Sequence, residues 1–91
     1  MIEKLWQNGL KDKVWELVLE QIKTQMTSAT FDTWFFGVNL LEITNDMVAI
    51  IQVPNQIRKH SLETNFKDTV EKALQIIVGQ EITVKFVQRR N

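Results

Sequence analysis

The chain reads Ser-Ala-Thr-Phe-Asp-Thr-Trp-Phe-Phe at residues 28–36, and this stretch gathers four of its eight aromatic side chains. Ser28 is a candidate N-cap, because its hydroxyl can accept a hydrogen bond from a free backbone N–H at a helix start. At about 100° per residue, Phe31, Trp34 and Phe35 fall on one helix face, which must be buried. Gly37 can adopt the positive φ that ends a helix. The stretch therefore predicts a short aromatic helix around which the other elements pack.

A longer helix is expected before it, over residues 13–26, which contain neither Gly nor Pro. Four apolar side chains recur there at helical intervals and form one buried stripe: Trp15, Leu19, Ile22 and Met26. Val14 and Val18 widen this apolar surface beyond the stripe. Two interpretations stay open. Either the sheet covers the extra width, or Val14, Trp15 and Val18 form a surface for a partner.

Two strands are expected after the aromatic helix. Residues 38–43 are apolar and half alternating, and residues 47–53 are rich in β-branched side chains. Turn-forming residues at 44–46 separate the two runs, so we expect an antiparallel hairpin. Pro54 cannot donate a ladder hydrogen bond and therefore ends the second strand.

A long helix is expected from the cap residue Asn55 to Gly79, followed by a strand over residues 81–87 with one wet face. Ile57 lies about 170° from the centre of the helix's apolar stripe and so points to solvent. His60 falls at the exposed edge of the stripe, where an ordinary surface histidine is expected. The order α-α-β-β-α-β predicts an α+β domain in which a three-stranded sheet packs with helices.

Length and composition bound the number of domains and their location. Ninety-one residues suffice for one domain, which we place at residues 13–88, between an N-terminal extension at 1–12 and a polar tail at 89–91. No apolar run approaches the roughly 20 residues that span a bilayer, and we expect no signal peptide. The absence of Cys excludes disulfides and fits a reducing compartment. We therefore expect a cytoplasmic domain without membrane contact.

Catalysis is not expected from this inventory of side chains. The chain has one His, no Cys and no Tyr, and its three Gly residues are isolated. The formal net charge of +0 gives no global field that would draw nucleic acid. We expect no enzyme, cofactor or metal site, so function must come from the surface. Ile57 is either a lone exposed apolar residue, as is common, or part of a small docking patch with Thr30 at the other helix start.

Several motifs, in this order and spacing, resemble one known family. They are Trp15-x-x-x-Leu19, Thr-Phe-Asp-Thr-Trp at 30–34, Val-Pro-Asn-Gln-Ile at 53–57, Leu-Glu-Thr-Asn-Phe at 62–66 and Gly-x-x-Ile-x-Val-Lys-Phe-Val at 79–87. Over residues 14–87 the chain resembles the N-terminal domain, domain I, of the bacterial chromosomal replication initiator DnaA. The resemblance implies a KH-like fold and a protein-protein interaction module.

The resemblance also implies partners and site residues. In this family the domain self-associates through its first helix, helps to recruit the replicative helicase and docks regulators of initiation. The self-association positions match Val14, Trp15 and Val18, so a weak homodimer is expected. The helicase and regulator positions match Thr30, Asn55 and Ile57.

Two other functions stay open. One is a weak single-stranded nucleic-acid-binding domain, although the chain lacks the Gly-x-x-Gly loop by which KH domains grip a nucleic-acid backbone. The other is a free-standing regulator that forms mixed dimers with the initiator.

Overall fold

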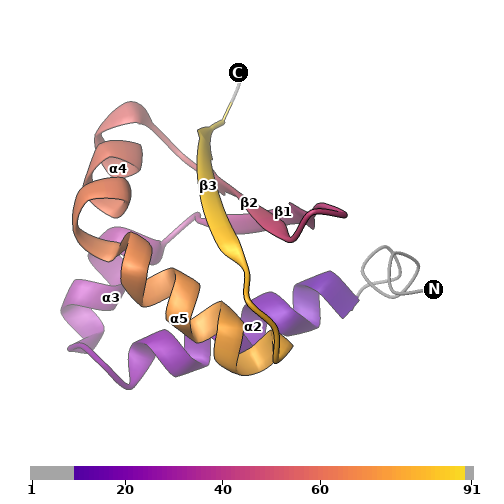
Figure 1. The fold of residues 1–91 in the computed structure, drawn as a ribbon. Coiled ribbons are helices and arrows are strands. Elements are labelled where there is room, and N and C mark those ends of the chain that lie inside the picture. Colours follow the sequence, from indigo (N-terminus) through magenta and orange to yellow (C-terminus); the bar gives the residue numbers. More distant parts are fainter. Residues whose placement is uncertain (1–9, 90–91) are drawn as a thin grey trace.

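A computed structural model describes residues 10–89, shown in Figure 1. The elements in chain order are α2 (Lys11–Lys23), α3 (Ser28–Phe35), β1 (Asn39–Ile43), β2 (Val48–Val53), α4 (Gln56–Ser61), the π-helical turn η2 (Leu62–Phe66), α5 (Lys67–Val78) and β3 (Thr83–Gln88). This α-α-β-β-α-β order confirms the predicted α+β class, because α4, η2 and α5 follow one another without a break.

The sheet has the order β1-β2-β3. β1 pairs with β2 antiparallel, as the hairpin pattern predicted, and β3 pairs with β2 in parallel. Leu40, Ile51 and Phe86 are partners across all three strands and are all buried. The register of β1 shifts between Leu40 and Glu42, and this bulge lets Leu40 and Ile43 both face the core despite their odd spacing.

Helices α2 and α5 pack against each other and cover the inner face of the sheet (Figure 1), with α2 contacting β1 and α5 contacting β3. The core between these layers is apolar throughout the described part of the chain. Its largest fully buried side chains are Val18, Ile22, Ile51, Val53, Leu62, Val70, Leu74 and Ile82.

The start of α3 differs from the prediction. Thr27, and not Ser28, is the N-cap: its backbone is extended, and its Oγ1 accepts a hydrogen bond from the Thr30 N–H at 3.2 Å. Ser28 is already helical. Both residues carry a hydroxyl, so the sequence pattern alone favoured neither side chain as the cap.

The aromatic face of α3 is less buried than predicted. Phe35 is buried, whereas Phe31 and Trp34 are half-buried. Phe31 stacks on Phe35 with ring centroids 5.3 Å apart, and Phe66 packs edge-on against Phe35 at 5.7 Å. This cluster joins α3 to η2, but the core lies mainly between α2, α5 and the sheet, so the prediction that the other elements pack around the aromatic stretch is wrong.

The boundaries of the other elements agree with the sequence to within a few residues. α2 begins at Lys11 and ends at Lys23, earlier than predicted at both ends. Asn55 caps α4, and Gly79 ends α5 with a φ of 80°. Most of the predicted N-terminal extension, residues 1–9, lies outside the described residues, as do residues 90–91 of the predicted tail.

Candidate docking surfaces

The three residues expected to self-associate are inside the domain. Val14, Trp15 and Val18 are 7%, 6% and 0% exposed. Of the two interpretations left open, this burial supports the one in which the domain itself covers the extra apolar width of the helix, and these side chains offer little surface to a partner. The reason is geometric. Because α2 packs against both α5 and β1, the domain buries a wider apolar face of this helix than a single stripe of side chains.

Trp15 is also held by a polar contact. Its indole Nε1–H donates to the Val38 carbonyl oxygen at 3.0 Å in a buried setting, which joins α2 to the segment just before β1. A buried indole needs such a partner, because an unpaired N–H would cost its desolvation. Trp15 is thus a structural residue of this domain.

The start of α4 is fixed by two polar contacts. The Asn55 Oδ1 accepts a hydrogen bond from the Arg58 N–H at 2.8 Å, which satisfies a free donor of the first turn. The Arg58 Nη1 donates to the Phe36 carbonyl oxygen at 2.7 Å and lies 3.4 Å from the Trp34 carbonyl oxygen. A guanidinium at the last carbonyls of α3 also complements the negative end of that helix.

The same two segments also lie near each other at Gly37 and Pro54. Gly37 has a φ of 76°, and a Cβ built on it would lie 3.6 Å from Pro54 Cγ. The turn that follows α3 therefore runs beside the turn that precedes α4. We call the surface formed by residues 33–41 and 54–62 the α3–α4 edge; both helices lie on the left side of Figure 1.

The α3–α4 edge carries the two most exposed large apolar side chains of the described residues. Phe36 is 79% exposed and Ile57 is 77% exposed. The exposure of Ile57 confirms the helical-wheel prediction. Phe36 was not singled out from the sequence, although a signal existed: it follows the buried Phe35 by one residue, about 100° around the helix.

Thr30 does not join this edge through any of these contacts. It sits in the first turn of α3, where its Oγ1 accepts a hydrogen bond from Thr27 Oγ1 at 2.9 Å. Arg58 reaches the opposite, C-terminal end of α3. The start of α4 thus meets the end of α3, and a docking role for Thr30 stays a prediction.

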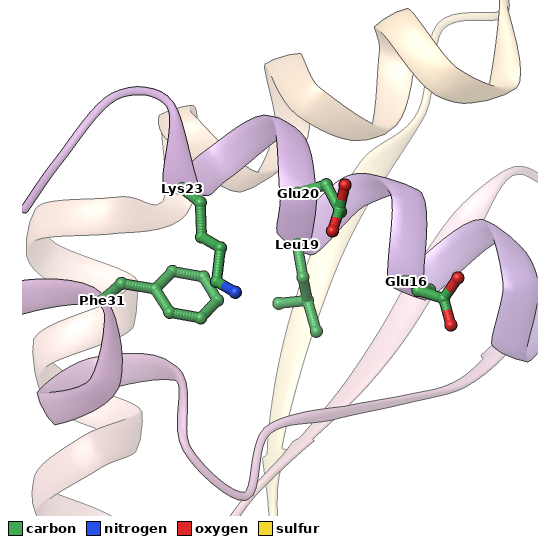
Figure 2. A pocket seen from close by; sticks show the side chains of 5 residues that line it. All are labelled: Glu16, Leu19, Glu20, Lys23 and Phe31. Carbon is green, nitrogen blue, oxygen red and sulfur yellow. The ribbon is translucent and has the colours of Figure 1, made fainter. Parts of the chain in front are cut away.

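A small hollow lies between α2 and α3, lined by Glu16, Leu19, Glu20, Lys23 and Phe31 (Figure 2). Its volume of about 170 Å³ is below the roughly 300 Å³ at which ligand pockets begin. The Lys23 ammonium lies 5.2 Å from the Phe31 ring centroid and so covers part of the floor, while Glu16 is paired with Lys13 at 3.1 Å. The hollow is too small and too open for a substrate site.

Residues 10–89 lack two other features that would point to a function. No group of three or more acidic or His side chains there could hold a metal ion. None of the helices in that range is both long and apolar enough to cross a membrane.

Comparison with known proteins identifies the family. The family model described as the DnaA N-terminal domain matches residues 12–76, which is most of the chain. The chain belongs to the DnaA N-terminal domain family. Two relatives are both named chromosomal replication initiator protein DnaA. The one from Thermodesulfovibrio yellowstonii is 34% identical over 76 residues, and the one from Roseiflexus castenholzii is 37% identical over 75 residues.

These alignments cover 84% and 82% of this chain but only 17% and 15% of the relatives. The range that the family model of the DnaA N-terminal domain matches extends from α2 into α5. It includes both Phe36 and Ile57, whereas β3 lies beyond it. The α3–α4 edge is thus part of the region that defines this DnaA-type domain.

Proposed function

We propose that this DnaA N-terminal domain is a non-catalytic protein-interaction module of a cytoplasmic replication initiator. Its role is to dock the replicative helicase and regulators of initiation on the α3–α4 edge. The observation that carries the proposal is the exposure of Phe36 and Ile57 on two segments that the hydrogen bonds of Arg58 join. Exposed apolar side chains on a fixed framework are typical anchors of protein interfaces.

Asn55 and Thr30 have different parts in this proposal. Asn55 holds the first turn of α4 and so fixes the direction of the neighbouring Ile57 side chain. Thr30 lies at the far end of α3 and contributes only if the partner covers the length of that helix, about 12 Å for eight residues.

The test is a titration of the labelled chain with the cognate replicative helicase, followed by amide chemical shifts. We expect shifts at residues 34–38 and 55–59, and weaker binding for Ile57→Ser. Ile76→Ser is the matched control, because Ile76 is 62% exposed but lies in the second half of α5. Absence of shifts at high helicase concentration would exclude helicase docking.

Self-association through α2 is the second part of the proposal. Leu10 and Leu17 remain 37% and 40% exposed on the outer side of this helix, so they offer apolar contact area that Val14, Trp15 and Val18 do not. In this proposal Val14, Trp15 and Val18 contribute only indirectly, because they pack α2 into the core and so position Leu10 and Leu17. Sedimentation should show a weak dimer at millimolar concentration that Leu17→Ser shifts toward monomer. A monomer at that concentration for the unmutated chain would overturn this part.

A further inference from the structure

β3 is an end strand of the sheet, so one side of it has no neighbouring strand within the described residues. The Thr83 N–H donates to the Met47 carbonyl oxygen at 3.1 Å, which shows that Thr83 faces β2. The Arg89 N–H donates to the Val53 carbonyl oxygen at 2.8 Å in the same way. Because backbone groups alternate in direction along a strand, the N–H and C=O groups of the even-numbered residues point to the free side. Such groups are a template for pairing with a strand of another chain.

Two side chains of α5 occupy this free side of β3. The Val84 N–H donates to the Glu71 Oε2 at 3.0 Å. The Gln75 Nε2 donates to the Ile82 carbonyl oxygen at 3.2 Å. Both backbone groups belong to even-numbered residues, at the start of β3 or directly before it, so they are groups that a further strand would use. The first half of the free side is therefore bonded to α5.

The geometry of a helix beside a strand makes this match regular. Glu71 and Gln75 are four residues apart, which is about 6 Å along a helix axis. Ile82 and Val84 are two residues apart, which is about 6.6 Å along a strand. α5 contacts β3 and runs in the opposite direction, so the earlier helix residue bonds to the later strand residue. Glu71 is half-buried and takes part in neither ion pair of residues 10–89, so β3 determines where its carboxylate lies.

We infer that Glu71 and Gln75 close the free side of β3 to strand addition by a second copy of this chain. An incoming strand, which would be β1 or β3 of the second copy because these are the end strands, must displace both side chains before it can pair. The outward N–H groups that remain belong to Phe86 and Gln88, and this stretch is too short for stable pairing alone. This role of the two side chains is independent of the proposed docking function.

The double substitution Glu71→Ala and Gln75→Ala tests this role in the whole chain. Leu17→Ser is added to the reference and to every variant, so that the proposed contact through α2 does not contribute. In sedimentation from micromolar to millimolar concentration, the reference should stay monomeric, whereas the average mass of the double variant should rise at least about twofold. A double variant that is still monomeric at millimolar concentration would overturn the inference.

Two control variants separate strand addition from a loss of stability. Glu71→Gln keeps a side-chain oxygen that can accept from the Val84 N–H, so this variant should stay monomeric. Gly79→Ala strains the backbone but leaves both hydrogen bonds between α5 and β3 in place. If Gly79→Ala associated as strongly as the double variant, partial unfolding would explain the association and strand addition would be refuted.

Hydrogen exchange of the Val84 amide locates the association. This amide should exchange faster in the dilute double variant than in the reference, because it has lost its acceptor, and should regain protection as the variant associates. An associated variant in which the Val84 amide still exchanges fast would place the contact elsewhere and refute the role of Glu71. Glu71→Ala alone frees the same amide with a smaller change. It should associate at higher concentration, and this result decides the matter if the double variant does not fold.

Discussion

The Trp15→Ala substitution should destabilise this domain far more than any substitution on its surface. The side chain is 6% exposed, and a buried Trp→Ala replacement typically costs about 3–5 kcal/mol through lost burial and an empty cavity. The Val38 carbonyl oxygen also loses its donor at 3.0 Å. We therefore expect a loss of about 4 kcal/mol in the free energy of unfolding, a large part of the stability of an ordinary small domain.

Urea unfolding followed by far-ultraviolet circular dichroism measures this loss, and thermal unfolding should show a midpoint lower by on the order of 20 °C. Leu17→Ala is the matched control, since Leu17 lies on the same helix but is 40% exposed. Trp15→Phe keeps an aromatic ring and removes the hydrogen-bond donor, so its unfolding midpoint should lie between those of Trp15→Ala and Leu17→Ala. If Trp15→Ala and Leu17→Ala had the same midpoint, Trp15 would not be part of the core.

Three other predictions follow from single contacts. Arg58→Ala removes a charged donor from the Phe36 carbonyl oxygen and should lower the free energy of unfolding by about 1.5 kcal/mol; equal urea midpoints would show that water replaces the guanidinium. Gly79 has a φ of 80°, and a Cβ added there would meet no neighbouring atom within 4 Å. Gly79→Ala should therefore lower the free energy of unfolding by about 1–2 kcal/mol through backbone strain alone. Calorimetry that finds the variant more stable would contradict this. Binding of single-stranded oligothymidine at physiological salt should be no tighter than about 10⁻⁴ to 10⁻⁶ M, as fluorescence anisotropy can check; salt-independent, tighter binding would restore the nucleic-acid alternative.

Periodicity predicted most of the helices and strands, because most of them bury one regular face; the exceptions are β1, which has a bulge, and α4, which has no buried residue. The stripe on α5 and the alternation of Ile82, Val84 and Phe86 in and before β3 are both buried as read from the sequence. Exposure of Ile57 was also predictable, since it depends only on the angle around one helix.

The misread features depend on contacts between elements. The sequence could not show that Val14 is buried, because its burial depends on α5 and β1 lying against α2. The link from Arg58 to Phe36 spans 22 residues and leaves no local pattern in the sequence. A bulge in β1 hid the core face of that strand, because Leu40 and Ile43 do not alternate.

The π-helical turn at Leu62–Phe66 sets the angular phase between α4 and α5. A π turn contains one residue more than the α turn it replaces, so removing a residue there would rotate α4 by roughly 100° about the shared axis. Arg58 would swing away from the carbonyl oxygens that it now reaches, and Ile57 would point in another direction. The length of this one turn, counted in residues, therefore decides whether Arg58 can join α4 to the end of α3.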